Sequence, residues 1–348
     1  MRLAALAGTL ALTAACTAAP EPPAEPPGPV SLQEVVDLAV EGYPGQIGVY
    51  VKHLGTGEEA LVRPDAAFNS ASVIKIPVLV LALQQAERGN LSLDERLEIR
   101  ADDLRPGSGI FQHHDLGLRP TMRDVLLQMI ITSDNTATDI AIQRVGGVDA
   151  VNTWLTEAGY ADGLRLHQTT GDLFRKYLTV ADARAGLFSD RDVHAVFTGR
   201  LAHSASPREG LEAVRAAMAA DGRAAAWNER TVGDQAYWLG SMTPRATGRL
   251  LEAIEGGALA SEGHTQEMRR MLRAQLAGAR RLPHYLTAAV AHKTGDFPPV
   301  LANDVGIIYA RSGPIVMAVF ANAIEGPYAE AEDRQGRLAQ RVVEYLDR

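Results

Sequence analysis

The sequence predicts an α+β protein in which an antiparallel sheet is assembled from the two ends of the chain and flanked by helices. Residues 46–53 alternate apolar and polar side chains, and after a Gly-Thr-Gly turn the chain returns over residues 59–63, which is typical of a β-hairpin. Three apolar segments near the C-terminus, at residues 290–293, 305–310 and 315–321, predict further strands. Helical patterns dominate between these two groups, so we expect an all-helical middle subdomain and a sheet built from both ends.

The first thirty residues carry export signals rather than a folded domain. Arg2 and the apolar run after it, up to residue 15, follow the pattern of a signal peptide, and the run is too short to span a membrane. It ends at Cys16, the only cysteine of the chain, after the small residues Thr-Ala-Ala. This resembles a bacterial lipobox, which predicts a lipidated Cys16 followed by a proline-rich tether over residues 16–30. The alternative is an ordinary signal peptide whose cysteine has no role.

Two helices frame the N-terminal hairpin. The first is expected at residues 31–41, because its opening residues form the capping-box pattern Ser-x-x-Glu. The second is expected from Ser72 to about Arg88, followed by the stop signal Gly-Asn, and it is apolar nearly all round, as buried helices are. Pro77 lies inside it, so we expect a local distortion.

The middle of the chain alternates helices with polar breaks. Residues 104–117 contain Pro-Gly-Ser-Gly and predict a loop, and residues 179–220 predict an interrupted helical segment. A break at residues 132–135 separates two apolar helices, so its polar side chains must find partners or line a cavity. Further helices are expected at residues 122–131, 135–146, 149–158, 243–255, 265–276 and 329–346.

We therefore expect a signal peptide over residues 1–15, a lipidated tether over 16–30, and one folded domain over 31–348. The α/β part of that domain comprises residues 31–88 and 288–348. Its helical part comprises residues 89–287.

Composition limits the classes of function. The chain has 348 residues, 46% of them hydrophobic, and a formal net charge of −8, which suits a globular protein and argues against nucleic acid as a partner. The adjacent residues His113, His114 and Asp115 have no second spaced cluster, so they predict a polar loop, and we expect no metal and no cofactor. A single cysteine excludes an intrachain disulfide. We expect a monomer.

A serine and a lysine at helical spacing provide the first chemical signal. Ser72 and Lys75 lie three residues apart and share a face of the predicted helix, so the amine can reach the hydroxyl. Burial lowers the pKa of a lysine and makes it a credible proton acceptor. The chain has only four lysines among its 34 basic residues, and arginine cannot take this role because it is never deprotonated. The alternative is a buried lysine with a purely structural role.

Three short motifs occur in order along the chain. They are Ser72-x-x-Lys75, Ser133-Asp134-Asn135 and Lys293-Thr294-Gly295. Together they resemble the penicillin-recognising serine hydrolases, and most closely the class A β-lactamases. The helix start at Thr243-Pro244 and the sequence Asn303-Asp304-Val305 are similar to that family too, so the resemblance covers roughly residues 31–348 and implies a β-lactamase/transpeptidase-like fold.

The resemblance implies a task for each motif. Ser72 would attack a carbonyl carbon while Lys75 takes its proton, and Ser133 would pass a proton to the leaving nitrogen with the help of the charge on Lys293. The substrate would be bound by the residues Asn135, Thr294, Gly295 and Asp296. In the family the backbone N–H groups of the nucleophile and of the residue after the third motif form the oxyanion hole, which here are those of Ser72 and Asp296.

The family's deacylating glutamate is missing. Class A enzymes carry it on a loop after the second motif, and the similar stretch here, residues 164–173, places Thr170 at that position. Asp172 and His167 are the candidate substitutes, although an aspartate two residues away and one methylene shorter need not reach the same water. The alternative is that both are ordinary loop residues. Acylation would survive this loss better than deacylation.

Two other features depart from the family. An insertion of about sixty residues, at roughly 175–240, would form a lid, a partner surface or, as the default, extra helical core. Asp296 would place a carboxylate where it repels an acidic substrate near Thr294.

Three functions follow from the resemblance. The first is an exported, membrane-anchored hydrolase of the cell envelope that forms an acyl-enzyme with β-lactams, as a class A-like β-lactamase. The second is a D,D-peptidase, amidase or esterase acting on peptidoglycan or another acyl substrate, for which the missing glutamate fits better. The third is a penicillin-binding or sensing lipoprotein without turnover. Zinc-dependent chemistry is disfavoured because no spaced histidine cluster occurs.

Overall fold

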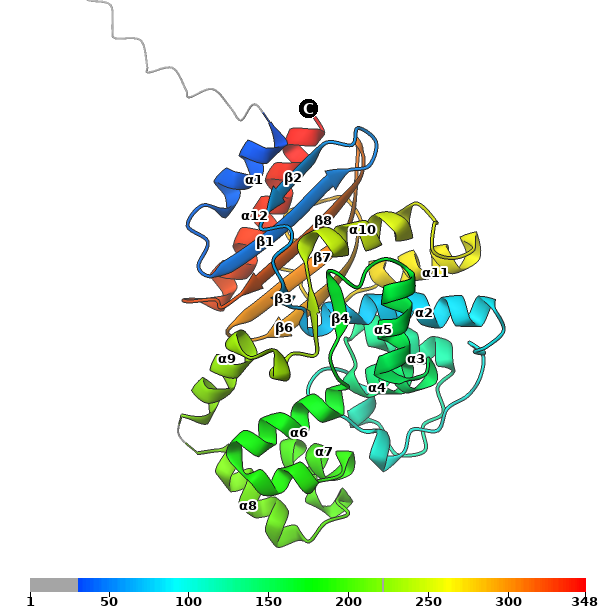
Figure 1. The fold of residues 1–348 in the computed structure, drawn as a ribbon, viewed down its shortest axis with the longest axis vertical. Helices are drawn as coiled ribbons and strands as arrows, with labels where there is room; N and C mark the ends of the chain where they lie inside the picture. Colours follow the sequence, from blue (N-terminus) through cyan, green and yellow to red (C-terminus); the bar gives the residue numbers. More distant parts are fainter. Residues whose placement is uncertain (1–30, 221) are drawn as a thin grey trace, which may run out of the picture.

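A computed structural model describes residues 31–220 and 222–348 of the chain (Figure 1). The predicted signal peptide, Cys16 and the proline-rich tether lie outside these residues. Within them, no helix combines the length and the apolar character needed to cross a membrane.

The sheet predicted from the two chain ends is confirmed. Its five strands are all antiparallel and follow the order β2-β1-β8-β7-β6. The N-terminal and C-terminal strands meet where β1 pairs with β8, with Val49 opposite Val319. The strand bounds are Gln46–His53 (β1), Glu59–Val62 (β2), Val290–Phe297 (β6), Leu301–Ala310 (β7) and Gly313–Asn322 (β8).

Helices cover both faces of this sheet. One face packs against α1 (Leu32–Val40) and α12 (Tyr328–Leu346), and the other faces α10 (Pro244–Glu255) and the helical part of the molecule (Figure 1). Alternation along β8 serves both layers, because Met317 packs toward α1 and α12 while Ala318 joins the opposite core. The sheet is therefore buried on both sides, and its edge strand β6 lies beside the helical part.

The helical part is built around α2 (Lys75–Glu87), whose first nine residues are all buried. We expected Pro77 to distort the helix by removing a hydrogen bond from its interior, and this was wrong. The α-helix begins only at Lys75, so Pro77 lies in the first turn, where its missing N–H removes no hydrogen bond. The distortion is instead a 3-10 turn over Ala71–Ile74 that carries Ser72. Around α2 pack the helices α3 (Met122–Ile131), α4 (Asn135–Arg144), α5 (Gly147–Glu157) and α11 (Glu262–Arg273).

A second, small sheet was not predicted. It has the order β3-β5-β4 and connects the nucleophile turn to the segment after α5. Its strands have only two or three residues, which is too short for an alternating pattern to emerge. Residues 164–173, expected to be a loop, therefore contain a strand and the start of α6. The bounds are Phe68–Asn69 (β3), Leu164–Leu166 (β4) and Gly240–Met242 (β5).

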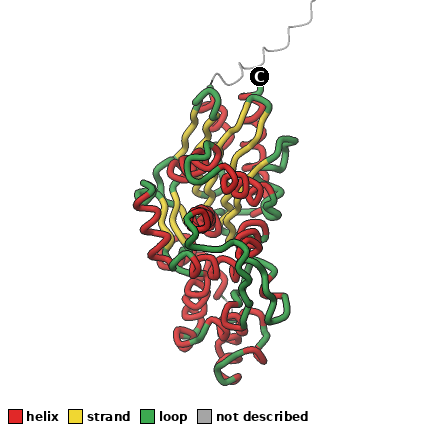
Figure 2. The backbone as a smooth tube through the Cα atoms, turned by 90° about the vertical axis from the view of Figure 1, so that its right-hand side faces the viewer, coloured by secondary structure: helices red, strands yellow, loops and turns green. Residues whose placement is uncertain are grey.

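The insertion forms a helical lobe below the small sheet (Figure 1), and Figure 2 shows it as helices joined by loops. The lobe has a small apolar core of its own, in which Leu178, Val193 and Leu211 are fully buried. The lobe thus contains helical core, as the default expectation had it, and its first and last helices also reach the site described below. The bounds are Thr170–Ala181 (α6), Asp190–Thr198 (α7), Arg208–Met218 (α8) and Arg223–Gly233 (α9).

Candidate active site

Ser72 is presented by the 3-10 turn between β3 and α2. The preceding residue, Ala71, has a φ of +41°, so the chain turns sharply before the serine. Ser72 is partly exposed and lines a cavity, and among the described residues its hydroxyl makes no hydrogen bond. The expected bond between Lys75 and this hydroxyl is absent from the structure. Such bonds are often long in ligand-free enzymes and tighten only when substrate binds.

Two buried lysines converge on Ser133. Nζ of Lys75 donates to Oγ of Ser133 at 3.2 Å and to its backbone O at 2.7 Å. Nζ of Lys293 donates to the same Oγ at 3.0 Å. Because Oγ accepts from both amines, the hydroxyl proton of Ser133 remains available for a ligand. Lys75 also donates to Oδ1 of Asn135 at 3.0 Å, so the first and second motifs form one network.

Burial sets the protonation of these lysines. Both side chains are fully buried. Loss of hydration is the largest cause that holds the pKa of Lys75 well below its usual value, and the charge of Lys293 adds to it. Burial likewise lowers the pKa of Lys293 to about 8, against the opposing effect of the carboxylates of Asp296 and Asp304. The site therefore holds an amine that is easily deprotonated beside one that is still largely charged at neutral pH.

The break between α3 and α4 holds Ser133 and Asn135 in fixed positions. Ser133 has a φ of +55°, and Asp134 caps α4 by accepting from the amide of Ala137 at 2.9 Å. Asp134 also accepts from the amides of Ile110 and Phe111 in the preceding loop. The polar residues of this break thus find partners, as the sequence required, and they anchor the loop that forms one side of the site.

The third motif lies on the edge strand β6, where its three residues face different surroundings. Lys293 and Thr294 are fully buried, so Thr294 offers no exposed surface to a ligand in this structure. A Cβ on Gly295 would lie 2.3 Å from the backbone O of Ser70. Glycine is therefore required for β6 to lie against the turn that carries Ser72, a reason different from the close approach of a substrate.

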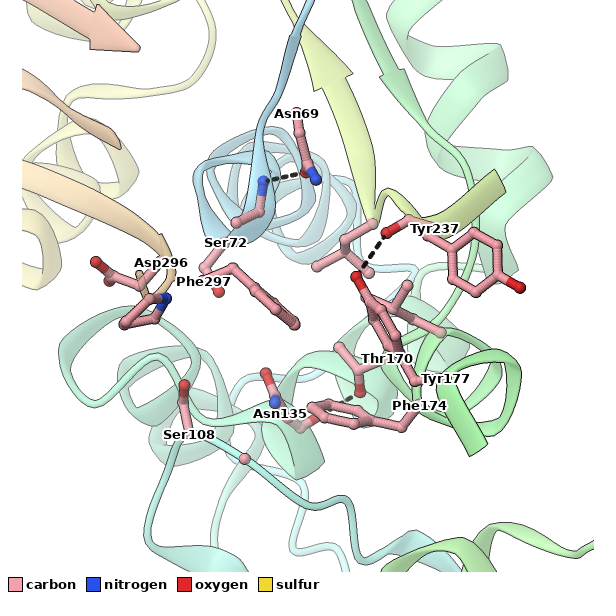
Figure 3. A pocket seen from close by; sticks show the side chains of 15 residues that line it. Asn69, Ser72, Ser108, Asn135, Thr170, Phe174, Tyr177, Tyr237, Asp296 and Phe297 are labelled. Carbon is pink, nitrogen blue, oxygen red and sulfur yellow. Dashed lines mark hydrogen bonds between the residues drawn. The ribbon is translucent and has the colours of Figure 1, made fainter. Parts of the chain in front are cut away.

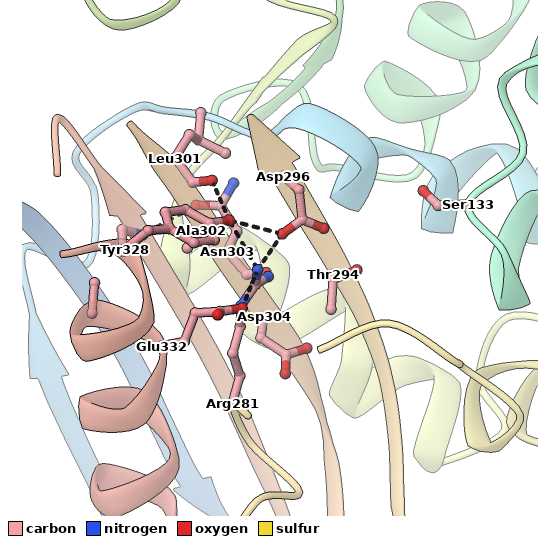
Figure 4. A network of polar contacts seen from close by, with 12 residues as sticks. Ser133, Arg281, Thr294, Asp296, Leu301, Ala302, Asn303, Asp304, Tyr328 and Glu332 are labelled. Atoms are coloured by element: carbon pink, nitrogen blue, oxygen red, sulfur yellow. Dashed lines mark hydrogen bonds and ion pairs between the residues drawn. The ribbon is translucent and has the colours of Figure 1, made fainter. Parts of the chain in front are cut away.

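The carboxylate of Asp296 is engaged away from the motif (Figure 4). It forms an ion pair with Arg281 and accepts from the hydroxyl of Tyr328 at 3.2 Å. Arg281 also pairs with Glu332 at 2.9 Å, and only 3% of its side chain is exposed. The repulsion expected from Asp296 toward an acidic substrate is therefore offset by a buried arginine that no sequence pattern singled out.

A cavity of about 240 Å³ opens beside Ser72 (Figure 3). Its floor comprises Ser72, Asn135 and Thr170, whose hydroxyl donates to the backbone O of Asn135 at 3.3 Å. Aromatic side chains form the opposite wall, and the Tyr177 ring stacks on Phe297 with centroids 5.3 Å apart. The wall combines residues of α6, of the end of the insertion and of the end of β6, and its members are Leu173, Phe174, Tyr177, Tyr237, Leu239, Phe297 and Pro298.

Comparison with known proteins identifies the family of this chain. A family model described as a beta-lactamase enzyme family matches residues 31–346. The chain belongs to this beta-lactamase family. It is 34% identical to Beta-lactamase L2 of Stenotrophomonas maltophilia over 160 residues, which are 45% of this chain and 52% of that protein. The chain thus matches about half the length of that curated relative.

Solved structures share the fold. A beta-lactamase from Sphaerobacter thermophilus DSM 20745 superposes with a TM-score of 0.67 at 24% identity, over 91% of this chain and 96% of that one. PBP-A superposes with a TM-score of 0.67 at 21% identity, over 91% of this chain and 96% of its own.

Within this beta-lactamase family member, neither candidate deacylation base reaches the cavity. The carboxylate of Asp172 pairs with Arg175 at 2.6 Å, is half exposed and does not line the cavity. The ring of His167 lies 3.2 Å from Oγ of Ser241, and burial lowers its pKa. Among the described residues that line the cavity, Asp296 is the only carboxylate, and Arg281 already holds it.

Thr170 does lie on the cavity, in line with the position assigned to it from the family. Its amide and that of Gly171 donate to the two carboxylate oxygens of Asp139, at 2.7 and 2.9 Å. Asp139 in turn accepts from Nε of Arg105 at 2.6 Å. No sequence pattern singled out Asp139 or Arg105.

Metal-binding side chains do not gather at one place in the part of the chain that the structure describes. No cluster of three or more histidine, cysteine, aspartate or glutamate side chains that could hold a metal ion occurs there.

Proposed function

We propose that the protein is a serine hydrolase that β-lactams acylate at Ser72. The observation that carries this proposal is the convergence of Lys75 and Lys293 on Ser133, next to a serine that opens on a cavity. Neutral Lys75 takes the proton of Ser72 as its Oγ attacks the lactam carbonyl carbon. The backbone N–H groups of Ser72 and Asp296 would bind the resulting oxyanion. Ser133 then gives its proton to the lactam nitrogen as the C–N bond breaks, and recovers a proton from a neighbouring lysine.

The rest of the site would hold the substrate. Asn135 has its amide oxygen on Lys75 and its amide nitrogen on the backbone O of Pro106 at 2.9 Å. It would therefore orient the lysine and border the acyl group. Lys293 and Thr294 would attract the substrate carboxylate after a local movement that exposes them, because both are buried without ligand.

A second candidate, a penicillin-binding protein with little turnover, is favoured by one observation. The cavity floor offers Thr170 rather than a carboxylate, and Phe174 stands one helical turn beyond it. A water on the acyl-enzyme would meet no free general base there. PBP-A, whose variant has been solved as an acyl-enzyme complex with penicillin G, shares the fold. A D,D-peptidase or esterase acting on peptidoglycan is the third candidate, for the same reason.

The aromatic wall favours an apolar acyl group. The wall residues Phe174 and Tyr177 come from α6, and the Tyr177 hydroxyl is already bonded to Oγ1 of Thr231 at 2.5 Å. A charged acyl substituent would lose its hydration without gaining a partner. We expect β-lactams with a neutral aryl side chain to acylate fastest.

Intact-mass spectrometry over time distinguishes the candidates. The domain from residue 29 onward is mixed with benzylpenicillin, and the adduct and the hydrolysed product are followed together. A transient adduct with accumulating product supports a β-lactamase, and a persistent adduct supports the penicillin-binding candidate. An absent adduct contradicts both and points to another acyl substrate.

We further infer that the chain is exported and anchored through lipidated Cys16, with the segment to residue 30 as a tether; this rests on the sequence alone. Labelling cells that produce the full chain with a palmitate analogue tests it. Cys16→Ala should abolish labelling and release the protein from the membrane fraction. Labelling that persists in this variant would contradict the inference.

A further inference from the structure

The residue before Ser72 has a backbone conformation that its side chain disfavours. Ala71 has a φ of +41°, in the left-handed region, where the Cβ of an L-residue crowds the neighbouring carbonyl. Residues other than glycine keep such a conformation only where the surrounding structure enforces it. Contacts of the turn must therefore hold Ala71, and with it Ser72, in place.

The side chain of Asn69 makes contacts that hold Ala71 in this conformation. Its Oδ1 accepts a hydrogen bond from the amide of Ala71 at 3.0 Å, directly beside Ser72 in Figure 3. Its Nδ2 donates to the backbone O of Thr231 at 3.0 Å. Both ends of the amide are engaged, and only 3% of Asn69 is exposed, so water competes little with either bond.

The backbone of Asn69 is fixed in turn by two buried asparagines of the large sheet. Its amide donates to Oδ1 of Asn322 at 2.9 Å, and its carbonyl O accepts from Nδ2 of Asn303 at 2.9 Å. Nδ2 of Asn322 also donates to Oδ1 of Asn303 at 3.1 Å. The side chain that holds Ala71 is therefore anchored to β7 and β8 rather than to a mobile surface.

We propose that Asn69 is a positioning residue for acylation, which keeps Ala71 left-handed so that the amide of Ser72 stays available to the oxyanion. This inference rests on the proposed function. Among the described residues the amide of Ser72 has no hydrogen-bond acceptor, as an oxyanion donor requires. A donor already fixed in place before the reaction costs no reorganisation when negative charge develops.

The other contact of Asn69 extends this support to the insertion. Thr231 belongs to α9, and its hydroxyl is bonded to Tyr177, whose ring lines the cavity. The inserted helices thus supply both the aromatic wall and a carbonyl that orients the Asn69 amide. If the amide were free to turn, its nitrogen would face the N–H of Ala71 and the bond that holds the turn would be lost.

A double-mutant cycle of Asn69→Ala and Ala71→Gly tests the proposal. Glycine adopts left-handed φ values readily, so it reduces the need for Asn69. We expect Asn69→Ala to slow acylation by benzylpenicillin about 100-fold, as small misplacements of reacting groups do. The dissociation constant of the initial complex should stay within about twofold, because the lost interaction acts in the transition state. Ala71→Gly alone should change the acylation rate little, and in the Asn69→Ala background it should raise that rate about tenfold.

Asn152→Ala is the matched control, because it removes an asparagine whose amide bonds the backbone of Leu166 at both ends and not Asn69. Any loss it causes should not be relieved by Ala71→Gly. Should the alanine variant of Asn69 not fold, Asn69→Ser takes its place, since a serine hydroxyl is too short to bridge both partners. An unchanged acylation rate, or a loss that Ala71→Gly does not relieve, would overturn the proposal.

A substrate-free measurement separates this inference from the proposed function. Crystal structures of the unaltered chain and of Asn69→Ala give φ of Ala71 directly. We expect a positive φ in the first and a negative φ in the second. A positive φ in both overturns the role of Asn69, whatever the substrate is, whereas a chain that no β-lactam labels but that shows the expected change contradicts only the proposed function.

Discussion

Lys75 and Lys293 lie 218 positions apart in the chain, yet their amines donate to the same oxygen, Oγ of Ser133, at 3.2 and 3.0 Å. Two ammonium groups that share one hydrogen-bond acceptor lie close together and repel each other when both are charged. Burial adds to the cost, so the network is most stable with one proton fewer. Burial and the charge of Lys293 hold the pKa of Lys75 well below its usual value, so we expect Lys75 to be the amine that loses its proton first.

Ser72→Ala should abolish covalent labelling by penicillin, because it removes the hydroxyl that we assign as the nucleophile at the cavity. Mass spectrometry of the protein after incubation measures this. Ser70→Ala is the matched control, since the Ser70 hydroxyl donates to the backbone O of Gly240 at 2.8 Å and is fully buried. Labelling that survives in Ser72→Ala would refute the nucleophile.

Lys75→Arg should lower the acylation rate constant by about 100-fold or more, because arginine keeps the charge but cannot accept a proton. Stopped-flow measurement with a chromogenic cephalosporin gives the rate. Lys52→Arg is the control, as Lys52 pairs with Glu252 of α10 and does not line the cavity. An unimpaired Lys75→Arg variant would show that Lys75 is not the base.

The acylation rate should depend on pH with two limbs. It falls toward acid pH as Lys75 gains a proton, and it falls above pH about 8 as Lys293 loses the charge that attracts the substrate carboxylate. Lys293→Arg keeps the charge at all these values, so the alkaline fall should disappear below pH about 10. A profile whose alkaline limb is the same in both proteins would assign that limb to another group.

Thr170→Glu should speed deacylation by about 10- to 100-fold, because Thr170 borders the cavity and a carboxylate there can activate water. Decay of the penicillin adduct, followed by mass, measures it. Asp172→Asn should leave the decay unchanged, since Asp172 is turned away and paired with Arg175. If the adduct of Thr170→Glu decays no faster than that of the unaltered chain, this part of α6 does not approach the acyl carbon. Slower decay in Asp172→Asn would restore Asp172 as the base.

Phe174→Ala should reduce acylation by benzylpenicillin about tenfold while acylation by 6-aminopenicillanic acid, which has no acyl side chain, changes little. The ring of Phe174 lines the cavity and contacts Phe197 edge-on at 5.1 Å. Phe188→Ala removes a similar ring that packs against the same lobe core but does not line the cavity. Equal losses with both substrates would indicate a general structural effect and contradict an apolar acyl site.

The sequence determined the local structure of this protein. Alternation in the N-terminal hairpin and three apolar segments near the C-terminus predicted all five strands of the large sheet, and the capping pattern at Ser31 marked a helix start that the structure confirms. Helical spacing placed Ser72 and Lys75 on neighbouring positions. Such features are set by residues a few positions apart, which is why they can be predicted from short patterns.

Tertiary structure alone decided which of these residues meet. It brought Lys293 to Ser133, turned Asp172 outward, paired Asp296 with Arg281, and placed the inserted Tyr177 against Phe297. It also decided that Asn69 holds the turn before the nucleophile. These approaches depend on how helices and sheet pack over the whole domain, because a buried charge or amide accepts whichever partner the packing brings within hydrogen-bonding distance.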